Sequence, residues 1–359
     1  MVSDYDEQAV DMVRAVELTR RVANDFGAAH AIALGYVGDR LGIFQALARD
    51  GPMTSGQLAV RTRLNERYVR EWAAAMAASG YIDYTAADET FHLTPEQSLV
   101  MATRSPLNLS GGFLYAVACI RQLPKLMEAF REGGGVPFAE FGPEIVEAIE
   151  RMFASGYELY VANQWIPAIP ELHELLKRGA EVAEVGCGAG QALIPVALAF
   201  PKSRFTGYDI DETSVGQARA KMDESGAAER VSFELVAAEE IPAVDVYDLV
   251  MAFNCIHDMS NPRGALRGMR RALKPGGFAL WTEARVSDRL EENLNPMGRL
   301  LYGTSVMHCM TVSLAGGGEG LGNVVGPETA RELANDAGFS SFDVLDVDNP
   351  YHRLFVLRK

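Results

Sequence analysis

The sequence predicts an α/β fold whose central feature is a parallel sheet in the C-terminal half of the chain. Two observations support this prediction. A short apolar strand candidate, residues 181–185, runs directly into three glycines and then into a helical pattern, the order found in nucleotide-binding strand–turn–helix units. Further along the chain, apolar runs alternate with helical patterns, which is typical of a parallel sheet covered on both faces.

The glycine turn has the sequence EVGCGAG and begins at Glu184. Gly186, Gly188 and Gly190 let the backbone turn tightly and approach a ligand, because no Cβ stands in the way. Their G-x-G-x-G spacing differs from the G-x-G-x-x-G of a dinucleotide pyrophosphate site. Glycine turns of this kind also occur without a ligand, so a purely structural role is the alternative for this motif alone.

A second strand candidate, residues 203–208, is followed at once by Asp209, 19 residues after Gly190. A carboxylate at this place can accept hydrogen bonds from both ribose hydroxyls. The pattern E-x-G-x-G-x-G with a second strand closing on aspartate resembles the class I S-adenosylmethionine-dependent methyltransferases. The resemblance implies a Rossmann-like seven-stranded fold, S-adenosylmethionine as cofactor with S-adenosylhomocysteine as product, and no metal.

Composition limits the alternatives. A length of 359 residues predicts two domains. A net charge of −15 argues against a nucleic-acid surface, which needs clustered Lys and Arg. The four cysteines form no C-x-x-C pair, which favours a reducing cytoplasm over a zinc site or a disulfide framework. The acidic N-terminus is unlike a signal peptide, and no apolar run approaches the ~20 residues that span a membrane.

Polar side chains fall at or just past the ends of several strand candidates. They are Glu184, Asp209, Glu239 and Asn254. Ligands of open α/β sheets bind at the carboxyl ends of the strands, so these positions predict one shared site. The seven predicted strands are residues 181–185, 203–208, 231–235, 247–253, 277–282, 343–347 and 353–358.

The resemblance assigns further cofactor contacts. It implies that Ile210 lies beside the adenine ring. In the third-strand loop this chain has Ala237 where the family has aspartate, so backbone groups of Ala238 or the Glu239 carboxylate would take over the adenine contact. The segment LKPGG, residues 273–277, matches the turn that precedes the fifth strand in the family.

The N-terminal part predicts a winged helix within a domain of residues 1–110. The predicted helices are residues 7–30, 31–48, 55–61 and 66–79, and the predicted hairpin strands are 81–84 and 91–93. Thr94-Pro95-Glu96-Gln97 reads as a capping box that starts another helix. The segments LGIFQALA and RYVREW resemble the dimerising module of small-molecule O-methyltransferases, which implies a homodimer.

A winged helix can also bind DNA. Between residues 30 and 100, however, six arginines stand against eight acids. The helix in the recognition position carries Arg63, Arg67 and Arg70, so a regulator that binds S-adenosylmethionine and DNA is the alternative function. A basic stripe on the folded surface would favour that alternative.

Residues 111–176 are predicted to form a helical connector that leads into a methyltransferase domain of residues 177–359. In relatives with this layout, such helices form one wall of the active site. Tyr157, Tyr160 and Trp165 are the aromatic candidates for this wall. Ordinary core packing is the alternative role for each of them.

Methyl transfer to a hydroxyl requires a base that removes its proton, and histidine suits this task because its pKa lies near neutrality. His257 follows the fourth strand in the segment NCIHD. The resemblance implies that this histidine is the base and that Glu283, at the end of the fifth strand, orients it. A structural His257 is the alternative. Asp258 reads as a helix cap, and Met259 replaces the aromatic residue usual in the family.

Residues 285–325 form an insertion that we interpret as a helical lid, because loops of this length are uncommon without a function. Its apolar side chains, with Met297 and Leu301 as candidates, predict an apolar acceptor pocket. His308 is a candidate second base, with packing as the alternative. A glycine run from Gly316 to Gly322 reads as a hinge. A dimer contact is the alternative role of the insertion.

The sequence therefore predicts a cytoplasmic S-adenosylmethionine-dependent methyltransferase that acts on an oxygen of a small, partly apolar molecule. The DNA-binding regulator is the second hypothesis. A nicotinamide dehydrogenase is the third, and the missing G-x-G-x-x-G spacing argues against it.

Overall fold

A computed structural model describes residues 10–225, 228–347, 349 and 351–359. The chain divides into two compact units, Met1–Val117 and Ala118–Lys359. The second unit joins most of the predicted connector to the predicted methyltransferase domain. The boundary lies within helix α6 (Gly111–Ile120).

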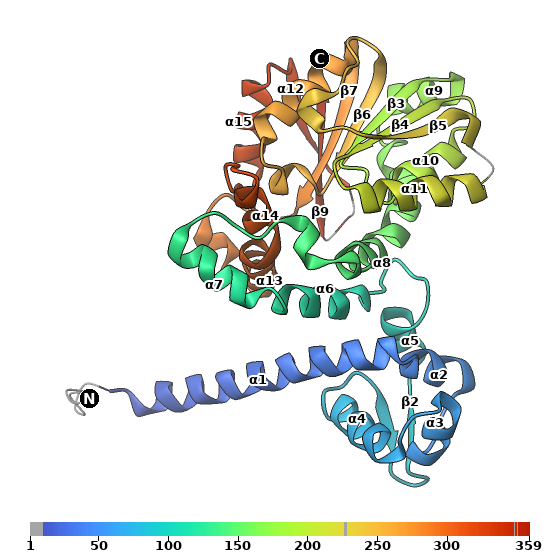
Figure 1. Cartoon of the computed structure of the whole chain (residues 1–359), viewed down its shortest axis with the longest axis vertical. Helices are drawn as coiled ribbons and strands as arrows, with labels where there is room; N and C mark the ends of the chain where they lie inside the picture. The colour runs from blue at the N-terminus through green and yellow to red at the C-terminus, as the bar shows by residue number, and fades with distance from the viewer. Residues whose placement is uncertain (1–9, 226–227, 348, 350) are drawn as a thin grey trace. The chain divides into compact units, whose positions relative to one another are not determined.

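The first unit is a helical domain with a small hairpin (Figure 1). Its elements are α1 (Met12–Arg40), α2 (Ile43–Asp50), α3 (Ser55–Thr62), α4 (Glu66–Ala78), β1 (Asp83–Thr85), β2 (Thr90–His92) and α5 (Pro95–Met101). The three caps that begin α3, α4 and α5 are Thr54, Asn65 and Thr94, and the two threonines form complete capping boxes. The predicted winged-helix elements are therefore present.

The long helix α1 corrects the prediction of two helices at 7–30 and 31–48. The chain stays helical to Arg40 and breaks at Gly42, whose φ is +69°. Two glycines inside this helix have a packing role and do not mark its end. A Cβ at Gly35 would lie 2.6 Å from Phe113, and one at Gly38 would lie 2.3 Å from Trp72. These glycines let neighbouring aromatic rings pack against the helix backbone, and they do not interrupt it.

The second unit is built on a seven-stranded sheet with the order β5-β4-β3-β6-β7-β9-β8. Neighbouring strands from β5 to β7 pair in parallel, and β9 pairs antiparallel with both β7 and β8. This mixed sheet confirms the predicted Rossmann-like seven-stranded methyltransferase fold. The strands are β3 (Glu181–Val185), β4 (Arg204–Asp209), β5 (Val231–Leu235), β6 (Tyr247–Phe253), β7 (Leu273–Ala284), β8 (Ser341–Leu345) and β9 (His352–Arg358).

Helices cover both faces of this sheet, each over its own apolar core (Figure 1). One face packs against α8 (Pro143–Tyr160), α9 (Pro170–Arg178), α10 (Leu193–Ala199) and α11 (Glu212–Ser225). The other face packs against α12 (Pro262–Ala272) and α15 (Pro327–Asp336). Strands buried on both faces account for the near-continuous apolar runs in the sequence.

Strand β7 is longer than predicted, because pairing begins inside the segment expected to be a turn. Tyr247 pairs with Leu273, and Leu249 then pairs with Phe278, so the register shifts between them. The shift leaves Gly276, with φ +75°, in a bulge. The LKPGG segment therefore still turns the backbone, but it does so within the strand.

The remaining elements lie in the connector and in the insertion 285–325. The connector contains α7 (Leu123–Glu132), the 3₁₀ turn η1 (Phe138–Phe141) and the π-helical segment η2 (Val161–Trp165). The insertion contains η6 (Leu290–Asn293), α13 (Pro296–Thr304), the π-helical η7 (Ser305–Cys309) and α14 (Met310–Ala315). Short 3₁₀ turns are η3 (Ala228–Arg230), η4 (Ala238–Glu240) and η5 (Ile256–Asp258). Among the described helices, none combines the length and apolar character needed to cross a membrane.

Candidate active site

The carboxyl ends of β3, β4 and β6 meet at one edge of the sheet, because β3 pairs in parallel with both β4 and β6. Glu184 is the residue before the last of β3, Asp209 is the last residue of β4, and Asn254 follows β6. The strand order reverses between β3 and β6, where ligands of such sheets bind. The topology therefore brings these three predicted residues to one place.

The glycine turn between β3 and α10 requires glycine at each of its three positions. Gly186, Gly188 and Gly190 have φ values of +65°, +52° and +78°, a region that side chains with a Cβ rarely adopt. A Cβ at Gly186 would also lie 2.7 Å from the Cys255 side chain. The backbone of this turn is thus left uncovered by side chains of its own.

Asp209 holds the glycine turn from the neighbouring strand. Its Oδ2 accepts a hydrogen bond of 2.8 Å from the backbone N–H of Gly188, and its Oδ1 accepts one of 2.9 Å from Asp211. Burial raises the pKa of this carboxyl, and the backbone donors oppose that rise. The next residue, Ile210, is 74% exposed, which leaves an apolar surface available for the predicted contact with the adenine ring.

Glu184 is buried, with 3% of its surface exposed. Burial raises the pKa of this carboxyl well above its usual value, and the backbone N–H of Leu193 opposes the rise. Within the described residues its Oε2 atom has no hydrogen-bond partner. A buried acceptor without a donor is costly, so this oxygen marks a place where a ligand that donates hydrogen bonds would stabilise the fold.

The third-strand loop contains Ala238, which is buried, and Glu239, which is half-buried. The Ala238 carbonyl packs against Gly268 of α12, where a Cβ would lie 2.1 Å from the oxygen. Arg271 donates hydrogen bonds of 3.0 and 2.7 Å to the carbonyls of Glu239 and Ile241. Helix α12 therefore fixes the loop, in part through Arg271, which was not among the residues predicted for the site.

His257 and Glu283 form a buried pair behind the ends of β6 and β7. The His257 Nδ1 atom lies 2.5 Å from Glu283 Oε2, and neither side chain is more than 4% exposed. The indole N–H of Trp281 donates a 2.7 Å hydrogen bond to the other Glu283 oxygen. Trp281 thus orients the Glu283 carboxylate, and Glu283 in turn orients the His257 imidazole.

The surroundings of His257 raise its pKa. Burial lowers the pKa of His257, but the interactions with Glu283 and with Cys309 of the insertion together outweigh burial, and the pKa lies well above its usual value. His257 is therefore a stronger base than an ordinary histidine, and it becomes neutral only at higher pH.

Asp258 does not cap the following helix as predicted. It lies in η5, and α12 is capped by Asn261, whose Oδ1 accepts a 2.9 Å hydrogen bond from the Gly264 N–H. The capping position is three residues further along because η5 intervenes between β6 and α12. Burial raises the pKa of Asp258 to about 7.

The aromatic candidates of the connector occupy different environments. The hydroxyl of Tyr157 accepts a 2.8 Å hydrogen bond from Asn254 Nδ2, which ties α8 to the end of β6. Trp165 is 1% exposed and packs in the core that α8, α9 and α10 share. Its contacts support core packing, the alternative already considered for it.

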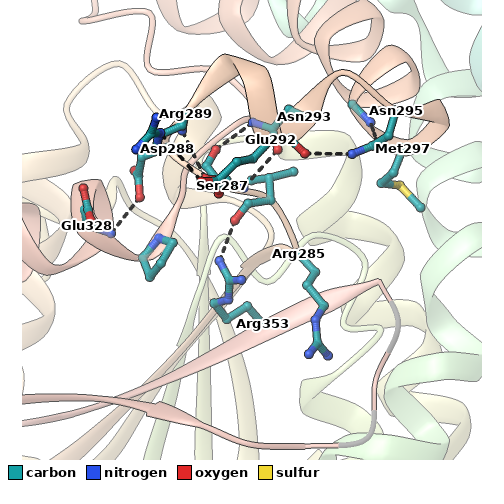
Figure 2. A pocket seen from close by; sticks show the side chains of 13 residues that line it. Arg285, Ser287, Asp288, Arg289, Glu292, Asn293, Asn295, Met297, Glu328 and Arg353 are labelled. Carbon is teal, nitrogen blue, oxygen red and sulfur yellow. Dashed lines mark hydrogen bonds and ion pairs between the residues drawn. The ribbon is translucent and has the colours of Figure 1, made fainter.

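The candidate acceptor-site residues of the insertion also lie in different environments. His308 is buried between the rings of Phe138 and Phe141, with ring centroids 5.7 and 4.8 Å away, and burial lowers its pKa to about 3. An imidazole with this pKa is neutral at ordinary pH. Leu301 is half-buried on α13, and Met297 lines a pocket near the ends of β7 and β9 (Figure 2).

Two residues that interact with the His257–Glu283 pair were not predicted from the sequence. Trp281 lies two residues before Glu283 in the same strand, so strand alternation places both on one face, and this signal was available. Cys309 comes from a distant segment, and only the packing of the insertion reveals its contact with His257.

Comparisons with protein families place two known domains on the chain. Residues 183–279 match the model described as "Methyltransferase domain", and residues 28–104 match the one described as "Rv2258c-like winged HTH domain". The chain thus carries a methyltransferase domain in its second unit and a winged helix-turn-helix domain in its first. Together with the sheet order, these matches define a two-domain protein of the class I methyltransferase fold.

Curated relatives match parts of the chain. The 27-O-demethylrifamycin SV methyltransferase of Amycolatopsis mediterranei is 33% identical over 103 residues, which cover 28% of this chain and 38% of the relative. The biotin biosynthesis bifunctional protein BioHC of Teredinibacter turnerae is 34% identical over 29% of this chain and 20% of the relative. A ubiquinone biosynthesis O-methyltransferase of Pseudomonas syringae is 25% identical over 50% of this chain and 73% of the relative.

Solved structures match over nearly the whole chain. The mitomycin 7-O-methyltransferase MmcR has a TM-score of 0.74 at 19% identity and covers 97% of this chain and 100% of its own. Human N-acetylserotonin methyltransferase, solved in complex with SAM, has a TM-score of 0.72 at 20% identity and covers 100% and 99%. At these identities the matches establish the fold.

Proposed function

We propose that this protein transfers a methyl group from S-adenosylmethionine to a hydroxyl oxygen of a small, partly apolar acceptor. The observation that carries the proposal is the buried His257–Glu283 pair behind the carboxyl ends of β6 and β7. Strand β6 lies next to β3, whose glycine turn forms the candidate cofactor site. A base and a nucleotide-type site on neighbouring strands are what this reaction needs.

The residues present fit S-adenosylmethionine. The glycine turn carries no side chain at Gly186, Gly188 and Gly190, Glu184 has a buried oxygen without a donor, and Asp209 lies at the end of β4. Glu184, Asp209 and the backbone of the turn would hold the polar groups of the molecule, and Ile210 its adenine ring. Ala238, Glu239 and Asn254 would complete the contacts. When bound, S-adenosylmethionine supplies an electrophilic methyl group.

The chain's own residues would handle the proton. Glu283 binds Nδ1 of His257, so Nε2 is left to take the proton of the acceptor hydroxyl. The Trp281 indole holds Glu283 through its second oxygen, which fixes the orientation of the imidazole. After transfer the imidazolium is stabilised by the Glu283 carboxylate beside it.

We also propose an acceptor site and an oligomeric state. Tyr157, Met297, Leu301 and His308 are proposed as acceptor-site residues, and Tyr157 hydrogen bonds to Asn254 at the end of β6. Names such as MmcR and N-acetylserotonin methyltransferase point to small organic acceptors. We further propose a homodimer in the cytoplasm.

The DNA-binding alternative finds little support on α4. Arg67 and Arg70 are exposed, but each forms an ion pair one helical turn away, with Glu71 and Glu66. Arg61 likewise pairs with Asp50. These pairs neutralise the stripe that a DNA-binding surface would need.

The test is turnover with a panel of phenols and other small hydroxyl compounds, read as release of S-adenosylhomocysteine. Replacing His257 by Ala should lower kcat by about 10²- to 10⁴-fold, because general base catalysis contributes this much. Affinity for S-adenosylmethionine should change less than threefold. His173→Ala, on α9 before β3, is the matched control and should keep full activity. A His257→Ala variant with wild-type kcat would refute the base assignment.

A further inference from the structure

Asn254 has an uncommon backbone conformation just past the end of β6. Its φ is +50°, in the left-handed region that few residues other than glycine adopt and that asparagine tolerates better than most. Its backbone N–H donates a 3.1 Å hydrogen bond to the Thr282 carbonyl of β7. Asn254 is therefore still bonded to the neighbouring strand while it turns the chain toward η5, which carries His257.

One side-chain contact holds the amide of Asn254. Its Nδ2 atom donates a 2.8 Å hydrogen bond to the hydroxyl of Tyr157 on α8. In the part of the chain that the structure describes, neither side chain has another hydrogen bond. A carboxamide has two N–H donors and an oxygen acceptor, so Oδ1 and one N–H of Asn254 stay available to a ligand.

The position of the Tyr157 hydroxyl is fixed by the packing of its ring. The ring packs against Phe153 and Phe253, with centroids 5.9 and 5.6 Å away. The rings of Trp165 and His352 both lie 6.4 Å from it. Tyr157 is only 6% exposed, so its ring cannot swing out of this cluster, and its hydroxyl oxygen stays in one place.

Packing alone does not account for this hydroxyl. Two of the four neighbouring rings are phenylalanines, and a phenylalanine at position 157 would fill the same space without the cost of burying a hydroxyl. The hydroxyl is not a base either. Burial raises the pKa of Tyr157, and the charges of Glu184 and Glu283 raise it further, so the hydroxyl keeps its proton.

The residue that this hydroxyl holds lies where the candidate cofactor site and the proton-transfer pair meet. Strand β6 pairs in parallel with β3 on one side and with β7 on the other. The next residue, Cys255, lies against the glycine turn, because a Cβ at Gly186 would be 2.7 Å from its side chain. The orientation of the Asn254 amide therefore bears on the cofactor site directly.

We propose that Tyr157 is a positioning residue whose hydroxyl fixes the Asn254 amide in the orientation that binds S-adenosylmethionine. This inference rests on the proposed function, because it takes Asn254 as a cofactor residue. Loss of the hydroxyl would leave the ring packing in place and free the amide to rotate. Binding would then have to order the amide, which lowers the affinity.

The test is calorimetric titration of the full-length protein with S-adenosylhomocysteine, which has no methyl group to transfer. Tyr157→Phe should bind it about three- to tenfold more weakly than the wild type does, the usual net worth of one hydrogen bond. Tyr160→Phe is the matched control on the same helix, because its hydroxyl has no hydrogen bond among the described residues. It should bind like the wild type.

A double-mutant cycle separates positioning from packing. Asn254→Gly removes the amide and still permits the left-handed backbone, and it should weaken binding at least as much as Tyr157→Phe does. In the Asn254→Gly background, Tyr157→Phe should change the affinity less than about twofold, because no amide is left to orient. A packing defect would weaken binding by the same factor in both backgrounds. In turnover, the loss in Tyr157→Phe should appear in the KM for S-adenosylmethionine more than in kcat.

The outcomes distinguish this inference from the proposed function. Wild-type affinity in Tyr157→Phe or in Asn254→Gly would overturn the positioning role and leave the cofactor site as proposed. An undiminished effect of Tyr157→Phe in the Asn254→Gly background would overturn it too. A folded wild type that does not bind S-adenosylhomocysteine would overturn the proposed function and the positioning role together.

Discussion

His257 and Glu283 link the chemistry of the site to pH. A histidine acts as a base only when it is neutral, and the pKa of His257 lies well above its usual value because Glu283 and Cys309 together outweigh the effect of burial. The rate should therefore rise with pH through this raised pKa, and the rising limb should lie above the ~6.5 of an ordinary histidine. The same shift makes the pair stabilise the fold most below ~6.5, and this stability is lost as pH rises through the folded-state pKa.

Replacing Glu283 by Gln should move the rising limb of the kcat/KM profile to lower pH. The amide carries no negative charge, so burial would then dominate and lower the pKa of His257. We expect kcat at the new optimum to fall as well, because the Gln side chain holds the imidazole less firmly. The measurement is the pH profile of both proteins between pH 5 and 10. A limb that stays in place would show that Glu283 does not set the charge of His257.

The positions at which the strands end could be predicted from the sequence. Most contacts of the residues at these strand ends could not. Glu184, Asp209 and Asn254 converge because parallel strands end at one edge. The assignment of Asp258 as a cap was wrong, because η5 shifts the start of α12 to Asn261. The Cys309 contact could not be predicted, since it depends on how an insertion folds back over the sheet.

Among the elements, the insertion is fixed to the loop after β6 by close backbone packing. A Cβ at Gly318 would lie 2.5 Å from Ser260 Cα, and Ser313 donates a 2.8 Å hydrogen bond to the Met259 carbonyl. The backbone N–H of Gly322 also donates to the His257 carbonyl at 3.0 Å. Part of the glycine run is therefore explained by close packing of its backbone against the loop after β6. A hinge was predicted there from the sequence.

Replacing Gly318 by Ala should destabilise the protein by about 1–3 kcal/mol, the usual cost of overpacking. Gly303→Ala is the matched control on α13, where a Cβ meets nothing within 4 Å, and it should stabilise the helix by up to about 1 kcal/mol. Denaturant unfolding of both variants measures the difference. Equal free energies of unfolding for the two variants would contradict the packing described here.

Most elements could be predicted from periodicity and from caps. The strands β3, β5 and β6 have the predicted bounds, because buried parallel strands leave a clear apolar signal. The errors fall where tertiary contacts override local patterns. The long α1 continues through glycines that accommodate aromatic rings, and β7 begins inside a turn motif through a bulge.

On the scale of the whole molecule, the exposed apolar side chains of α1 bear on assembly. Val13, Val16, Val22 and Phe26 are between 46% and 69% exposed. Their spacing of three to six residues puts several on one side of the helix. Apolar side chains gathered in this way favour contact with another chain, which supports the proposed homodimer.

A Val22→Glu/Phe26→Glu variant should be monomeric, because two buried charges without partners disfavour an apolar interface. Light scattering coupled to size-exclusion chromatography should give twice 39.0 kDa for the wild type and 39.0 kDa for the variant. Glu17→Gln on the same helix is the control and should remain dimeric. A wild type that elutes as a monomer would refute the dimer.

The class of fold could be predicted at this scale, because strand–helix alternation is a local signal repeated along the chain. The pocket beyond β7 could not. Arg285 and Arg353 lie 68 positions apart in the sequence, and both line it because β9 pairs antiparallel with β7.

The central claim is that the edge formed by β3 and β4 binds S-adenosylmethionine. Calorimetric titration of S-adenosylmethionine into the wild type and into Asp209→Ala tests it most directly, with Asp343→Ala on the exposed face of β8 as control. We expect binding to the wild type and to the control, and at least tenfold weaker binding to Asp209→Ala. A folded wild type that does not bind S-adenosylmethionine, or an Asp209→Ala variant that binds it equally well, would contradict this assignment of the site.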